Sequence, residues 1–176
     1  MGIQLRRKKR PAESNSTESL REITVVLDLP PSTNKLYQKR REGGLALTKA
    51  AKKYREHVKQ VIGQHIAMLT RFPVDLETIY QFDVTLFLES TQNEGWFQRF
   101  AKGPRQGQRK AKTRYKRIDY DNRIKFVQDC LVKCIGIPDD SQIFRGVQEK
   151  REDSEDPRAV VVIHVLDQDE FFPERR

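Results

Sequence analysis

The segment Tyr80-Gln81-Phe82-Asp83-Val84-Thr85-Leu86-Phe87-Leu88 has an apolar side chain at every second position. Successive side chains of a strand point to opposite faces, so this alternation predicts a strand with one buried face. Residues 23–29 alternate in the same way, and Pro30-Pro31 must end that segment because proline has no N–H to donate. The two segments predict two strands of a small sheet.

Apolar spacing becomes helical in two places outside these strands. From Thr48, a residue that caps helix N-termini well, an apolar stripe continues to Leu69. A second helix is expected over residues 121–135, with Gly136 as its stop. The expected buried stripe of this second helix consists of Ile124, Val127, Leu131 and Cys134.

Two further strands complete the expected fold. Residues 141–148 and 159–166 are predicted as strands, and a polar loop over 152–158 joins them. The sequence therefore predicts a mixed α/β (α+β) fold, a small sheet of about four strands with two main helices.

Length and composition predict one domain with a polyanionic partner. The chain has 176 residues, 34% of them charged, and a net charge of +9, which favours nucleic acid or an anionic membrane surface. Residues 1–21 are basic and then polar, so we expect a disordered tail, followed by a domain over 22–168 and a C-terminal tail over 169–176.

Several classes of protein are disfavoured. The longest apolar stretch, 159–166, is too short to span a bilayer, and no apolar segment follows the basic N-terminus, so we expect an intracellular (cytoplasmic) protein. Cys130 and Cys134 have no further thiols or histidines at metal-ligand spacing nearby. We expect them to be small buried residues without a disulfide, and the histidines give no zinc motif.

Residues 90–118 form an expected long basic loop. Between Gly95 and Ile118 there are nine Lys or Arg residues and no acid, with aromatic residues interleaved. Such a composition suits a segment that grips phosphates, although a solvated insertion remains the alternative. The candidate nucleic-acid-binding residues in this loop are Arg109, Lys110, Lys112, Arg114, Lys116 and Arg117.

The chemistry is expected in Asp119-Tyr120-Asp121-Asn122-Arg123-Ile124-Lys125 and in Asp139-Asp140. Convergent carboxylates repel one another, and oxygen ligands select Mg²⁺, with Mn²⁺ as a substitute. A divalent ion on a basic protein suggests phosphodiester hydrolysis, with Lys125 stabilising the transition state. We expect Asp140 to approach Asp119 and Asp121, because one ion cannot bind scattered ligands.

A purely structural reading of the same residues stays open. Asp121 caps a helix in that reading, Asp119 is favoured by the helix dipole, and Asp139-Asp140 is an ordinary turn. Lys125 then simply pairs with acids on a solvated helix face.

The motifs resemble those of the RusA family of Holliday junction resolvases. The resemblance rests on Pro30 to Tyr37, Asp119-x-Asp121-Asn122-x-x-Lys125 and Asp139-Asp140-Ser141-Gln142, and extends over about residues 22–166. It implies a homodimeric, Mg²⁺-dependent endodeoxyribonuclease with a small mixed α/β fold, which resolves four-way junctions by paired incisions in DNA recombination and repair, without a small-molecule cofactor.

Carried over by position, Asp119, Asp121 and Asp140 resemble the metal-binding carboxylates, and Lys125 resembles the catalytic lysine. The role of Asp139, a possible further metal ligand, and of Asp129 is less defined. Asn34 and Lys35 fall in a loop that the resemblance leads us to expect near DNA. The N-terminal tail and the basic loop depart from the compact family members. Two other functions are therefore kept: a non-catalytic basic nucleic-acid-binding module, and a flap- or fork-specific nuclease with the same site.

Overall fold

The computed structural model describes residues 19–32, 35–116, 118 and 120–172. Residues 1–18 of the predicted tail over 1–21 lie outside the described part of the chain. Leu20 is described: it packs on the core, and its N–H donates to the carbonyl oxygen of Arg71 at 2.9 Å. No helix in the described part of the chain is long and apolar enough to cross a membrane.

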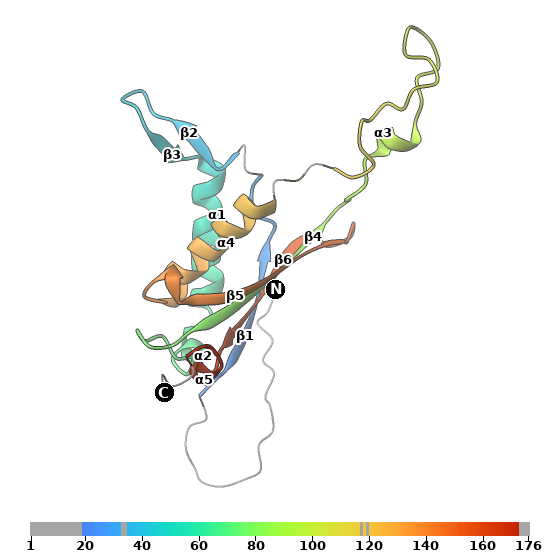
Figure 1. Ribbon diagram of the computed structural model, residues 1–176. Helices are drawn as coiled ribbons and strands as arrows, with labels where there is room; N and C mark the ends of the chain where they lie inside the picture. Colours follow the sequence, from blue (N-terminus) through green and yellow to red (C-terminus); the bar gives the residue numbers. More distant parts are fainter. Residues whose placement is uncertain (1–18, 33–34, 117, 119, 173–176) are drawn as a thin grey trace.

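A mixed sheet forms the centre of the molecule. Its strands are β1 (Glu22–Asp28), β4 (Tyr80–Leu88), β5 (Ile143–Glu152) and β6 (Arg158–Val165), in the order β1-β6-β4-β5. β6 is antiparallel to both β1 and β4, whereas β4 and β5 are parallel. The four-stranded sheet is confirmed, and β5 forms one of its edges (Figure 1).

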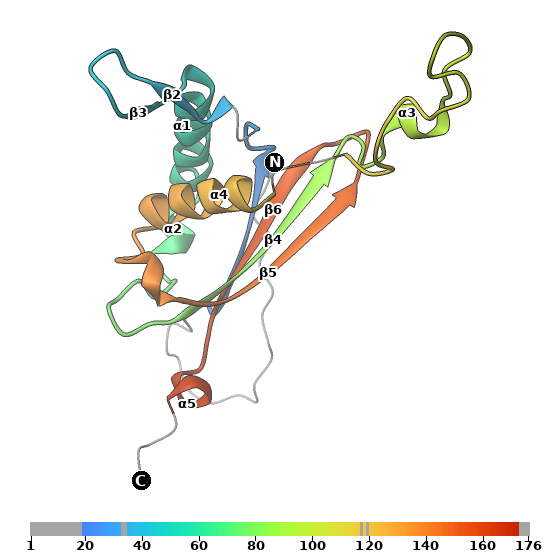
Figure 2. The same cartoon turned by 45° about the horizontal axis from the view of Figure 1, so that its top comes forward.

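Two long helices cover one face of the sheet, α1 (Lys49–Gly63) and α4 (Tyr120–Ile135) (Figure 2). The alternating apolar residues of β1, β4 and β6 point toward these helices and are buried. Thr48 caps α1 as expected, accepting a hydrogen bond from the N–H of Ala51 at 3.2 Å. Gly136 has a φ of 90°, which a residue with a side chain rarely adopts, and it ends α4. The mixed α/β fold is therefore confirmed.

Three segments differ from the sequence prediction in their bounds or in their type of structure. The apolar stripe from Thr48 to Leu69 is split into α1 and the short helix α2 (Ile66–Leu69). The predicted strand over 141–148 begins only at Ile143, because a 3-10 helix, η2 (Asp140–Gln142), precedes it. The expected C-terminal tail contains a short helix, α5 (Gln168–Phe171), whose Phe171 ring packs edge-on against Phe144. Residues 173–176 lie outside the described part.

The sequence prediction missed a small hairpin. Strands β2 (Tyr37–Lys39) and β3 (Leu45–Leu47) pair antiparallel and form a separate two-stranded sheet just before α1. Three-residue strands give too short an alternation to be recognised, and β2 is exposed along its whole length, so it shows no buried face.

The predicted basic loop is a folded projection, which we call the arm (residues 90–116). It contains the short helix α3 (Glu94–Phe97), and backbone hydrogen bonds join its two sides from Thr91–Lys116 outward to Phe100–Gln108. Figures 1 and 2 show it extending away from the end of β4. Besides these backbone hydrogen bonds, cation–π contacts of Arg109 with Trp96 and of Arg105 with Phe100 hold the arm together.

Candidate active site

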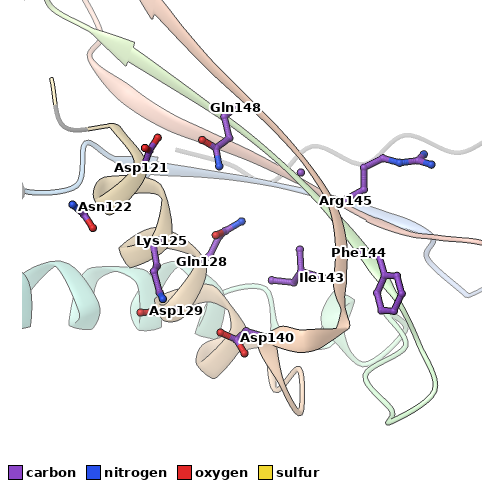
Figure 3. A pocket seen from close by; sticks show the side chains of 11 residues that line it. Asp121, Asn122, Lys125, Gln128, Asp129, Asp140, Ile143, Phe144, Arg145 and Gln148 are labelled. Atoms are coloured by element: carbon purple, nitrogen blue, oxygen red, sulfur yellow. The ribbon is translucent and has the colours of Figure 1, made fainter. Parts of the chain in front are cut away.

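A hollow of about 540 Å³ lies between helix α4 and the edge strand β5 (Figure 3). Its walls combine carboxylates, amides, a lysine and the exposed part of β5. The lining residues are Asp121, Asn122, Lys125, Gln128, Asp129, Asp140, Ile143, Phe144, Arg145, Gly146 and Gln148.

Helix α4 supplies the acid–lysine–acid row of the hollow. Asp121, Lys125 and Asp129 are spaced four residues apart, so they lie on one face of the helix, with Lys125 between the two carboxylates. On the opposite side of the helix Ile124 and Leu131 are almost fully buried. Burial of that face fixes the rotation of α4 and turns the row toward β5.

Asp140 enters the hollow from η2. The preceding residue, Asp139, is the N-cap of η2, and its Oδ1 accepts a hydrogen bond from the N–H of Ser141 at 2.8 Å. Hydrogen bonds from Ser141 lower the pKa of Asp139. Asp139 therefore has a capping role and does not line the hollow, whereas Asp140 does.

Gln142 holds this turn in place from inside the protein. Its side chain is 8% exposed, and its Nε2 donates to the carbonyl oxygens of Asp75 at 2.8 Å and Thr78 at 2.7 Å. Its Oε1 accepts from the N–H of Asp139 at 3.2 Å. The motif Asp139-Asp140-Ser141-Gln142 is thus a capping box that orients Asp140.

Asp129 is a site residue that the sequence analysis left without a defined role. Partial burial raises its pKa, and the nearby charge of Asp140 raises it further. Three cations, Lys125 first among them, act in the opposite direction. Two carboxylates close enough to influence each other, with a lysine beside them, form the acidic part of the hollow. The i, i+4 spacing from Lys125 was the signal available in the sequence.

The expected convergence of three aspartates can be followed only in part. Asp119 lies outside the described residues. Asp121 lies at the start of α4, whereas Asp140 lies beside the Asp129 end of the row (Figure 3). Asp121 and Asp129 are eight residues apart, a rise of about 12 Å along a helix. Within the described residues no three His, Cys, Asp or Glu side chains are grouped closely enough to hold a metal ion.

The structural reading of Asp121 as a helix cap does not apply. Helix α4 starts at Tyr120, so Asp121 lies inside the first turn and not at the N-cap. A carboxylate there is favoured by the helix dipole, and it remains exposed to solvent at the hollow.

Inside the arm, some of the predicted DNA-binding cations have internal partners. The Arg109 guanidinium lies 3.9 Å from the centre of the Trp96 ring, and its Nη1 donates to the Trp96 carbonyl oxygen at 3.0 Å. Lys110 Nζ donates to Gln98 Oε1 at 3.1 Å. These two side chains hold the sides of the arm together.

The remaining predicted DNA-binding residues fall into two groups. Lys112, Arg114 and Lys116 are exposed on the arm, and Lys35 is exposed at the start of the β2–β3 segment. Asn34 and Arg117 lie outside the described residues.

The two cysteines and His164 lie outside the hollow. Cys130 and Cys134 are free, and burial raises the pKa of Cys130 to about 12, as expected for a small buried residue. His164 lies between Glu22 and Asp83, with nitrogen–oxygen distances of 3.1 and 3.2 Å, on the sheet face away from α1 and α4.

A hollow lined by aspartates around a lysine, on a basic chain with an ordered cationic arm, has the side chains that an enzyme acting on phosphodiesters of nucleic acid requires. The family model described as Endodeoxyribonuclease RusA matches residues 28–164. The chain therefore belongs to the RusA endodeoxyribonuclease family, and this membership implies a nuclease that acts on Holliday junctions. A search of curated proteins finds no match.

Proposed function

We propose that this protein is an Mg²⁺-dependent endodeoxyribonuclease that resolves Holliday junctions during DNA recombination and repair inside the cell. The observation that carries the proposal is the row Asp121–Lys125–Asp129, with Asp140 beside its Asp129 end, in a solvent-open hollow in a chain of this family. The hollow between α4 and β5 is open to solvent, which gives a DNA backbone access to the row.

The donor set suits a hard cation. All the carboxylates around the hollow offer oxygen ligands, which Mg²⁺ and Mn²⁺ prefer. In this proposal Asp121, Asp140 and Asp119 would hold the ion. Asp140 lies beside Asp129 rather than Asp121 here, so binding of one ion would bring Asp121 and Asp140 closer together. The bound ion would supply a polarised water and offset the negative charge of the phosphate. Asp139 is excluded from this set in our proposal, because its carboxylate is engaged in the cap of η2.

Lys125 is assigned to the scissile phosphate. Its ammonium has three donors and is exposed at the middle of the row, so it can donate to a non-bridging phosphate oxygen. Such a donor stabilises the charge that develops as water attacks phosphorus. Asp129, one turn further on, places an opposite charge near Lys125 in the hollow.

The assembly is proposed to be a homodimer. Paired incisions in a four-way junction need two active sites, and one chain has one such hollow in its described part. The edge strand β5 is exposed over most of its length, and an edge strand presents unpaired backbone groups to a second chain. No small-molecule cofactor enters the proposal.

The test is an endonuclease assay with three substrates: a synthetic immobile four-way junction, a fork and a linear duplex, each with and without Mg²⁺. We expect paired nicks in the junction with Mg²⁺ and none in EDTA. Asp121→Asn is the matched inactive control, expected to bind the junction without cutting it. Preferential cutting of the fork would favour the flap- or fork-specific alternative, and binding without any cutting would favour the non-catalytic module.

A further inference from the structure

The β2–β3 hairpin is an exposed basic projection whose tip lies beyond the motif residues, because the motif from Pro30 ends at Tyr37, where β2 begins. Residues 37–45 are all exposed, and the turn at the tip is closed by a hydrogen bond from the N–H of Arg40 to the carbonyl oxygen of Gly44 at 3.1 Å. Lys39, Arg40 and Arg41 stand together at this tip. Gly43 and Gly44 adopt positive φ values of 88° and 81°, which allow the tight reversal.

The base of the hairpin is firmly held. Leu36 is 1% exposed, and its carbonyl oxygen accepts a hydrogen bond from the N–H of Thr48 at 2.9 Å. The Thr48 hydroxyl also donates to the carbonyl oxygen of Lys35, and the same residue caps α1. Leu47 packs on the edge of the core. The hairpin therefore extends into solvent from a fixed base.

Its position relates it to the active site. Figures 1 and 2 show the hairpin and the arm projecting from the same end of the molecule, with the start of α4 between their bases. Asp121, at that start, belongs to the hollow. DNA that enters the hollow from this end passes between two basic projections.

The charge of the segment indicates what it contacts. Residues 35–53 contain seven Lys or Arg residues and one acid, Glu42. Three adjacent tip cations make the electrostatic potential around the tip more positive. Lys and Arg side chains on an exposed ribbon of this kind can neutralise phosphates of the DNA backbone. A purely solvated hairpin needs no such concentration of one sign of charge.

We propose that the β2–β3 hairpin grips the phosphate backbone of one duplex arm of the substrate, on the opposite side of the active site from the arm of residues 90–116. This inference rests on the proposed function, since it assumes a branched DNA substrate. It assigns Arg40 and Arg41 to DNA binding and leaves the chemical step to the hollow.

The experiment compares Arg40→Ala/Arg41→Ala with Arg21→Ala/Lys59→Ala. The second pair removes the same charge from exposed cations just before β1 and in the second half of α1, away from the hairpin. Junction affinity is measured by fluorescence anisotropy across a salt series in EDTA, and cleavage with Mg²⁺ at saturating DNA. Thermal unfolding checks that both pairs fold.

Each phosphate that the protein neutralises adds about 0.9 to the slope of log affinity against log salt. We expect the hairpin pair to flatten this slope by about 0.9 for each phosphate that the hairpin no longer binds. The cleavage rate at saturation should be unchanged, and so should the slope for the control pair. Equal slopes for the two pairs would overturn the hairpin proposal alone. If the unmodified chain neither binds nor cuts branched DNA, the proposed function fails as well.

Discussion

The side-chain amide nitrogen of Gln142 donates to the carbonyl oxygen of Thr78 across 64 residues of sequence, at 2.7 Å. Thr78 is held in turn by Asp75, whose Oδ1 accepts from its N–H at 2.7 Å and from its hydroxyl at 2.8 Å. The turn that carries Asp140 is therefore attached to an ordered loop at the start of β4. The orientation of a carboxylate in the hollow depends on a buried amide that never contacts the hollow.

We predict that Gln142→Ala lowers both stability and cleavage. Leaving the buried carbonyl oxygens of this contact without a donor costs about 1–3 kcal/mol, and Asp140 loses its support. Chemical denaturation gives the change in the free energy of unfolding, and single-turnover cleavage of a junction gives the rate. Gln60→Ala, on the exposed face of α1, is the control. A variant with full activity and lowered stability would show that Gln142 supports the fold but not the site.

Lys125→Ala should lose cleavage while it keeps junction binding. Removal of a donor that stabilises transition-state charge typically costs about 10²–10³ in rate. The measurement is the single-turnover rate at saturating junction and Mg²⁺. Lys59→Ala removes a lysine from another helix and is expected to cut at the unmodified rate. A reduction of less than tenfold in Lys125→Ala would assign Lys125 to the helix surface, the alternative that the sequence left open.

Asp129 should make the folded protein less stable as pH rises. Burial raises its pKa, so the folded state keeps the proton longer than the unfolded chain does. The loss of folding free energy caused by ionised Asp129 is absent below the unfolded pKa of about 3.9. It grows as pH rises toward the raised folded pKa and reaches its full value above that pKa. Asp129→Asn should thus raise the melting temperature at neutral pH in EDTA, with the difference vanishing in acid. An equal difference at both pH values would exclude titration of Asp129 as the cause.

Exposed cations of the arm and the cation that contacts Trp96 within it should have different effects when they are replaced by alanine. Lys102 and Lys112 are exposed, and Lys102→Ala/Lys112→Ala should flatten the salt dependence of junction binding by about 0.9 for each phosphate no longer bound, while the arm stays folded. Arg109→Ala removes the Trp96 interaction, worth about 0.5–1 kcal/mol at an exposed site, and should expose the arm to protease. Limited proteolysis and anisotropy measure the two effects. Equal protease resistance in Arg109→Ala would mean that the arm is held by its backbone hydrogen bonds alone.

Local periodicity was sufficient for the sheet and the two main helices. The alternation from Tyr80 to Leu88 and the cap at Thr48 are properties of neighbouring residues, so they can be read without a fold. The hairpin before α1 and the order of the arm were not predictable in the same way. Three-residue strands carry too little pattern, and the arm depends on cross-chain contacts such as that of Arg109 with Trp96.

For the site, the sequence by itself determined the residue types and their helical spacing. Asp121, Lys125 and Asp129 share a face of α4 because they are spaced four residues apart. Only the tertiary structure decided that Asp140 lies beside Asp129 rather than beside Asp121. That placement follows from the turn after Gly136 and from the hydrogen bonds of Gln142 to a distant loop. Such contacts join segments far apart in the chain, and spacing along the sequence contains no information about their distance in space.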